Sequence, residues 1–173
     1  MGSADCSLAI DSTLSEKSRE AQIRFSVEGQ ESKSIRVIQF GYGKQIILKE
    51  PTVEIESSAR YDDRYFDAVI SANVAFKIDS NVEYSFEGLT DADNENELES
   101  DRTGWIEMPK ADDLEINLDR GYRPRTVKVR FKWKANIVPC TRVAKIRLLP
   151  KNADEQLIDN EGNPTGEVIL TVK

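Results

Sequence analysis

One stretch of this sequence alternates strictly between apolar and basic side chains. The apolar set is Val127, Val129, Phe131 and Trp133, and the basic set is Lys128, Arg130, Lys132 and Lys134. Successive side chains of a β-strand point to opposite faces of a sheet. The pattern therefore predicts a strand with one buried face and one solvated face.

Similar short runs, rich in β-branched residues, recur along the chain. They cover residues 21–27, 35–38, 69–78, 143–148 and 168–172, with turn-forming residues between them. No stretch of a dozen residues repeats apolar side chains at helical spacing. Short strands at this spacing indicate an all-β domain, either a sandwich or a barrel, and we expect antiparallel sheets.

The chain also contains an internal repeat. The sequence REAQIRF at 19–25 matches RVAKIRL at 142–148, and each is followed by a polar turn and a closing strand. A weaker match precedes each arginine, where a hydrophobic strand gives way to a polar turn. We expect residues 5–42 to be the closing strands of a preceding, partial repeat and residues 45–173 to form one complete sandwich. Chance similarity between two amphipathic strands is one alternative. A second is that residues 5–42 are a strand set that docks on the sandwich.

Composition excludes most catalytic chemistry. The 173 residues include no histidine, which removes Ser–His–Asp and Cys–His nucleophile activation. Two cysteines cannot build a four-cysteine zinc site, and no glycine-rich phosphate-binding pattern occurs. A pair of carboxylates that hydrolyses glycosides is the remaining enzymatic alternative, but no acidic residue has a recognisable apolar setting. We expect a protein that is not an enzyme and needs no cofactor.

Charge and hydropathy constrain the partners. The net charge of −7 disfavours nucleic acid and anionic lipid. No window approaches the roughly 18 apolar residues that a membrane-spanning helix needs. No apolar run follows the N-terminus, so we expect no signal peptide within this sequence; any export signal would lie outside it.

The two cysteines leave two alternatives open. A disulfide between Cys6 and Cys140 would tie distant parts of the chain together. Two buried free thiols are the other interpretation.

Three segments carry a family resemblance. They read VISANVAFKI at 69–78, GWIEMP at 104–109 and VKVRFKWKANIVPCTRVAKIRL at 127–148. Together they resemble the BACON domain, whose pattern places Ala-Asn or Ser-Asn at a strand end, a Trp before an aliphatic residue, and an Arg two residues before the alanine of a later strand. The matching positions are Ala72-Asn73, Trp105-Ile106, Ala135-Asn136 and Arg142-Val143-Ala144.

The resemblance covers residues 52–173 in full and 5–42 in part. Two features depart from the family pattern: the final strand lacks the usual glutamine, and the loop at 90–103 is longer than typical. The resemblance implies a seven-stranded immunoglobulin-like β-sandwich from a surface or secreted protein of Bacteroidota, often beside glycan-degrading modules. The family name implies carbohydrate binding, although many members resemble spacers.

An acidic loop offers a candidate metal site. It contains Asp91, Asp93 and Glu95, followed by Glu97, Glu99 and Asp101. Hard cations such as Ca²⁺ prefer several carboxylate and carbonyl oxygens. The glycine of the EF-hand turn is missing, so a solvated loop without an ion is the alternative.

Tyrosines offer a candidate carbohydrate site, because flat aromatic rings stack on pyranose faces. We expect Trp105 and Trp133 to lie in the core. The aromatic residues left for a binding platform are Tyr61, Tyr65, Tyr84 and Tyr122. Structural packing of these tyrosines is the alternative.

The basic row 128–134 also has two interpretations. It could meet an anionic glycan or the acidic face of a neighbouring domain. It could equally protect a solvent-facing strand against edge-to-edge pairing.

Taken together, the patterns predict a non-catalytic module that acts as a spacer or display domain in a glycan-associated protein. We expect its setting to be the cell surface, the periplasm or the secreted fraction of a Gram-negative bacterium, with neighbouring domains as partners. One alternative is direct binding of polysaccharide. Another is an adhesin or pilus-like subunit, in which unpaired strand edges of the partial repeat accept a strand from another chain.

Overall fold

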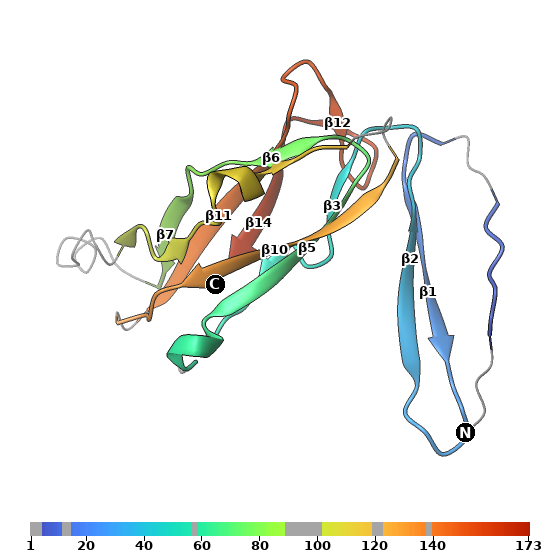
Figure 1. The fold of residues 1–173 in the computed structure, drawn as a ribbon, viewed down its shortest axis with the longest axis horizontal. Helices are drawn as coiled ribbons and strands as arrows, with labels where there is room; N and C mark the ends of the chain where they lie inside the picture. The colour runs from blue at the N-terminus through green and yellow to red at the C-terminus, as the bar shows by residue number, and fades with distance from the viewer. Residues whose placement is uncertain (1–4, 12–14, 57–58, 89–101, 119–122, 138–139) are drawn as a thin grey trace.

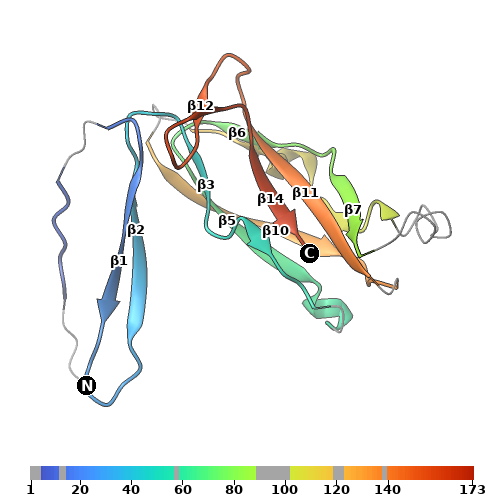
Figure 2. The ribbon, with the colours of Figure 1, turned by 180° about the vertical axis from the view of Figure 1, so that it is seen from behind.

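A computed structural model gives the fold of the chain (Figures 1 and 2). It describes residues 5–11, 15–56, 59–88, 102–118, 123–137 and 140–173.

Two sheets pack face to face as a β-sandwich. The first contains, in spatial order, β3 (Ile46–Leu48), β5 (Tyr65–Ala72), β10 (Arg125–Trp133) and β8 (Ile106–Glu107). The second contains β4 (Thr52–Val53), β14 (Val168–Val172), β11 (Thr141–Pro150), β6 (Phe76–Ile78) and β9 (Glu115–Ile116), and β7 (Glu83–Glu87) also pairs with β11.

This strand order confirms the predicted immunoglobulin-like sandwich. With strands lettered along the chain, the first sheet (β3, β5, β10, β8) has the spatial order A–B–E–D. In the second sheet β6, β11 and β14 lie side by side as strands C, F and G. The ladders are antiparallel except that β4 runs parallel to β14. The chain therefore crosses from one sheet to the other between β5 and β6, at Ala72-Asn73, where the family pattern places a strand end.

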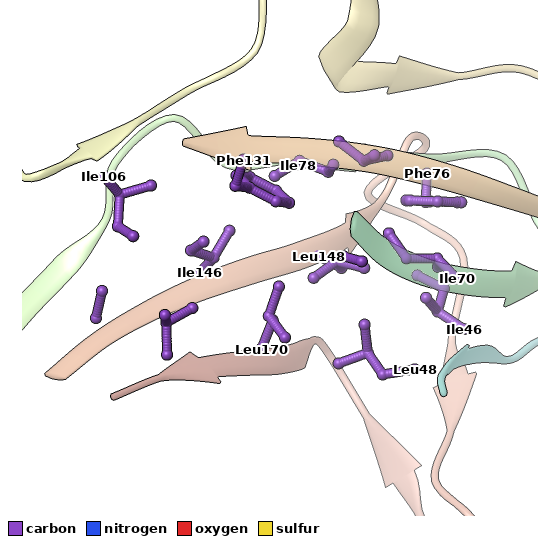
Figure 3. Close-up of a cluster of buried hydrophobic side chains, with 14 of the residues drawn as sticks. Ile46, Leu48, Ile70, Phe76, Ile78, Ile106, Phe131, Ile146, Leu148 and Leu170 are labelled. Atoms are coloured by element: carbon purple, nitrogen blue, oxygen red, sulfur yellow. The ribbon is translucent and has the colours of Figure 1, made fainter. Parts of the chain in front are cut away.

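The alternating pattern of β10 produces the core. Its apolar side chains Val129, Phe131 and Trp133 are buried, whereas the intervening basic residues face solvent. They pack against fully buried residues of β11 and β14 (Figure 3). Trp105 and Trp133 both belong to this core, as predicted.

The N-terminal strands form a separate two-stranded sheet. Strands β1 (Arg19–Phe25) and β2 (Lys33–Gln39) pair as an antiparallel hairpin that stands beside the sandwich (Figures 1 and 2). The hairpin shares no ladder with the sandwich sheets among the described residues. Its interpretation as the end of a preceding repeat remains a prediction at this point.

A tight joint fastens the base of the hairpin to the sandwich. A Cβ atom on Gly41 would lie 2.3 Å from the carbonyl oxygen of Ser15, and one on Gly43 would lie 2.3 Å from Cδ1 of Ile158. The buried Gln45 accepts a hydrogen bond from the Ser18 amide at 3.2 Å. The two glycines are thus required by close packing.

Gln45 also connects this joint to the sandwich itself. Its side-chain amide donates to the Asp159 carbonyl at 2.9 Å, and its backbone amide donates to Asn73 Oδ1 at 2.7 Å. The Asn73 side chain in turn donates to the Gly43 carbonyl at 2.8 Å. Buried polar groups must be hydrogen-bonded to be tolerated, and here they hold three chain segments together.

The remaining short elements lie at the ends of the sandwich. They are the 3₁₀ turns η1 (Tyr61–Asp63) and η2 (Ala111–Leu114) and the pair β12 (Leu157–Ile158) and β13 (Pro164–Thr165). Across the described part of the chain, no helix is long and apolar enough to span a membrane.

Neither cysteine is part of a disulfide in this structure. Cys6 is exposed and Cys140 is half-buried. The expectation that both free thiols are buried is therefore wrong for Cys6, because its segment has no covering sheet among the described residues.

Candidate carbohydrate site

The turn before β5 determines where two of the predicted tyrosines lie. Tyr61 begins η1, and Tyr65 is the first residue of β5. The Arg64 carbonyl between them accepts a hydrogen bond from the Trp133 amide at 3.1 Å, and the Arg64 side chain donates to the Ala59 carbonyl at 3.1 Å. The turn is thus tied to the end of β10.

The two tyrosine rings differ in what surrounds them. Tyr61 is 82% exposed, so its ring is available to a ligand. Tyr65 is 40% exposed, and the Arg130 guanidinium carbon lies 4.0 Å from the centre of its ring. This cation–π contact covers part of the Tyr65 ring and orients it.

Arg130 is itself held by a carboxylate on the neighbouring strand. Its Nε and Nη2 donate to the two carboxylate oxygens of Asp67 at 2.7 and 2.9 Å. The hydrogen bond from Arg130 holds the pKa of Asp67 below its usual range. The paired planar groups form a rigid base beside the tyrosines.

A shallow pocket lies beside this base. It has a volume of about 130 Å³ and is lined by Tyr61, Asp62, Arg64, Tyr65, Glu107, Lys132 and Trp133. Enclosed small-molecule pockets measure about 300–1,000 Å³, so this one could hold only the edge of a ligand. The shallow site combines an aromatic ring, two carboxylates and basic side chains. This combination suits a single sugar ring, whose apolar face can stack on the aromatic ring while its hydroxyl groups bond to the charged side chains.

The structure does not bring Tyr84 to this pocket. Tyr84 lies on β7 in the opposite sheet, and its ring packs on Trp105 with centroids 5.8 Å apart. Burial raises the pKa of its hydroxyl, which contacts the backbone of Ile106 and Gly104. Tyr84 therefore packs at the edge of the hydrophobic core.

The other predicted site residues lie outside the described residues. These are Tyr122 and the three acidic residues Asp91, Asp93 and Glu95. Calcium binding at the acidic loop therefore stays a prediction. Within the residues that the structure describes, no group of three acidic or cysteine side chains could hold a metal ion.

Sequence reasoning missed Glu107, which lines the pocket, and Asp67, which lies beside it. Glu107 joins the pocket because it pairs with Lys132 across β8 and β10, and Asp67 is the register partner of Arg130. Asp67 and Arg130 are far apart in sequence, so only the strand register reveals their pairing. The basic row is accordingly not a row of free charges, since Arg130 is neutralised.

A second cavity lies at the same end of the sandwich, between the two sheets. Its volume is about 210 Å³, and its lining includes Trp105, Trp133 and Arg142. The Arg142 guanidinium carbon lies 4.4 Å from the centre of the Trp105 ring, and its nitrogens donate to the carbonyls of Lys134 and Ala135 at 2.6 and 3.3 Å. Arg142 thus fastens the loop between β10 and β11.

Comparisons with protein-family models, with curated proteins and with solved structures found no match. The resemblance to the BACON domain consequently remains a prediction.

Proposed function

We propose that this chain is a non-catalytic module of a cell-surface or secreted protein, in which it acts as a spacer or display domain beside glycan-active partners. The observation that carries the proposal is the joint around Gly41 and Gln45, which links a hairpin and a sandwich in series. When β units are joined in series by buried contacts, the position of one unit fixes the position of the next, so the array can hold its two ends apart.

The use of buried polar side chains supports the same proposal. Among the described residues these are Gln45, Asn73 and Arg142. Each hydrogen-bonds to backbone groups that hold segments together. A general acid or base needs a titratable side chain that can exchange a proton with substrate. These three side chains instead bond to the backbone.

Affinity electrophoresis and hydrolysis assays on a panel of polysaccharides test this proposal. A spacer migrates at the same rate with and without polysaccharide in the gel, and it releases no reducing sugar. Release of sugar by the purified chain would contradict the non-catalytic assignment.

Direct carbohydrate binding is the second candidate function, and the exposed ring of Tyr61 above the shallow pocket favours it. A shallow site without enclosure suits weak binding to a chain end or to one face of a polymer. Retardation in the gel that is lost in Tyr61→Ala and retained in Tyr42→Ala would establish this function in place of a pure spacer. Tyr42 is the matched control because it is also well exposed but lies at the hairpin joint.

A further inference from the structure

The β1–β2 hairpin has one apolar face that points away from the sandwich. Phe25 on this face is 41% exposed, and Ile23 and Val37 are half-buried. The segment 5–11 runs beside this face (Figures 1 and 2), and a groove of about 310 Å³ separates them. The groove is lined mainly by the apolar residues Leu8, Ala9, Ile10, Ala21, Ile23 and Val37.

The register of this hairpin matches that of β11 and β14. Ala21 pairs with Val37 and Ile23 pairs with Ile35 in the hairpin. Ala144 pairs with Val172 and Ile146 pairs with Leu170 in the sandwich, and all four of these residues are fully buried. The same side-chain types thus occupy the same ladder positions, once exposed and once in the core.

A repeated hydrogen bond extends this equivalence upstream. Arg19 Nη2 donates to the Asp11 carbonyl at 2.5 Å, and Arg142 Nη2 donates to the Lys134 carbonyl at 2.6 Å. Donor and acceptor are offset by the same 123 residues, from 19 to 142 and from 11 to 134. Chance similarity of two amphipathic strands does not explain a shared contact outside those strands.

The offset identifies residues 5–11 as the counterpart of the end of β10. Leu8 and Ile10 then correspond to Phe131 and Trp133, which face the core. In the sandwich β10 lies between β5 and the two-residue β8, and the inward residues of β5 share the burial of the core. The described part of the N-terminal unit contains no strand equivalent to β5.

We propose that the groove between residues 5–11 and the β1–β2 hairpin is a binding site for one extended β-strand with the alternation of β5. The strand lies antiparallel to residues 5–11 and pairs with their backbone groups. Its apolar side chains cover Ala21, Ile23 and Val37. Residues 5–11 belong to no described ladder, and open backbone groups beside an exposed apolar face are what strand addition uses.

A second copy of this chain is a poor source of such a strand. Its own β5 is hydrogen-bonded on both edges, to β3 and to β10. The occupant is instead a strand from outside residues 1–173 that has the same inward alternation of apolar residues as Phe66, Ala68, Ile70 and Ala72. This inference rests on the proposed function, because the added strand would complete the unit that is joined in series to the sandwich.

A donor strand attached to the full chain tests this inference. In the sandwich, Ala72 at the end of β5 pairs with Arg125 at the start of β10. A second copy of residues 65–72 can therefore be joined ahead of residue 1 by a short Gly-Ser linker. The sandwich retains its own β5, so it reports within the same molecule that the chain is folded.

Hydrogen exchange followed by mass spectrometry is the measurement. We expect the amides of residues 5–11, β1 and β2 to exchange at least about tenfold more slowly with the donor strand than without it. A control donor, in which the inward and outward side chains are exchanged, gives no protection. Ile23→Asp on the apolar face removes the protection, whereas Gln22→Asp on the opposite face preserves it.

Three results would overturn the inference. The first is unchanged exchange in the hairpin when the donor strand is present, and the second is equal protection by the control donor. The third is a concentration-dependent dimer of the unmodified chain that Ile23→Asp dissociates, because a second copy would then be the occupant. None of these results affects the spacer proposal, which the polysaccharide assays test separately.

Discussion

At the scale of single residues, the buried polar groups carry more of the architecture than the exposed charges do. Arg142 is almost fully buried against Trp105 and bonds two carbonyls, whereas Arg147 lies in exposed ion pairs with Glu83 and Glu167. Exposed pairs contribute little because solvent screens them. Two arginines five residues apart on one strand therefore have very different importance.

Truncation of these two arginines makes the contrast measurable. We expect Arg142→Ala to lower the free energy of unfolding by about 3 kcal/mol, because two carbonyls lose their donor and the Trp105 ring loses its packing partner. Arg147→Ala serves as control and should cost less than about 1 kcal/mol. Urea unfolding monitored by tryptophan fluorescence gives both values, and equal losses would contradict this assignment.

Asp67 provides a prediction of pH dependence. Its pKa is lowered in the folded protein by the hydrogen bond from Arg130, so the stabilisation is complete above the ordinary carboxyl pKa. It is lost as pH falls from about 4 through the lowered pKa. Because the pair is exposed, the effect should stay below about 1 kcal/mol.

Titration of Asp67 by nuclear magnetic resonance measures this shift directly. We expect the pKa of its carboxyl to return toward the ordinary value in Arg130→Gln. A carboxyl that titrates identically in both proteins would show that Arg130 does not bind it in solution.

At the scale of elements, alternation predicts long strands and fails for short ones. The run at 127–133 became β10 with nearly the expected bounds. Strands such as β4, β8 and β12 contain two residues each, which is too few to show any period. Their positions depend on tertiary pairing that no local pattern encodes.

The candidate site shows the same division. Tyr61 and Tyr65 were predicted from their residue type and their turn-like surroundings. Their partners Asp67, Arg130 and Glu107 meet only through the register of β5, β10 and β8. Tyr84 was indistinguishable by residue type from the exposed tyrosines, but its strand pairs with β11 and places the ring on Trp105.

The repeated strands offer a matched pair of substitutions. Ile146 is fully buried, whereas the equivalent Ile23 lines an open groove. We expect Ile146→Asp to destabilise the sandwich by more than about 4 kcal/mol, because it buries an unpaired charge. Ile23→Asp should change its stability by less than about 1 kcal/mol.

Tryptophan fluorescence during urea unfolding measures both effects, because Trp105 and Trp133 report on the sandwich alone. A large loss of sandwich stability in Ile23→Asp would mean that the two units share one cooperative core.

At the scale of the whole molecule, the chain combines one closed sandwich with a separate two-stranded hairpin attached through a close-packed joint. Gln22, Arg36 and Ile38 of the hairpin line a groove with β3 and β5, whereas Ala21, Ile23 and Val37 line the groove beside residues 5–11. The joint around Gly41 and Gln45 fixes this arrangement. The internal repeat already matched residues 19–25 with 142–148, and the two ladders place the matched residues at equivalent positions.

Substitution of the joint glycine tests its role. We expect Gly41→Ala to accelerate amide exchange at residues 15–18, at the base of the hairpin, since its Cβ would overlap the Ser15 carbonyl. Gly166→Ala is the control, because a Cβ there would meet no atom within 4 Å. Hydrogen exchange compares the two variants, and indistinguishable rates at the joint would contradict this role.

The most direct test of the whole account is amide hydrogen exchange along the unmodified 173-residue chain. If the sandwich is complete and the hairpin is open, amides exchange slowly in β5, β10, β11 and β14 and fast in β1 and β2. This difference is expected even though the β1–β2 and β11–β14 ladders have matching registers. Protection of β1 and β2 equal to that of β11 and β14 in the monomer would contradict it, because the hairpin would then already belong to a closed core.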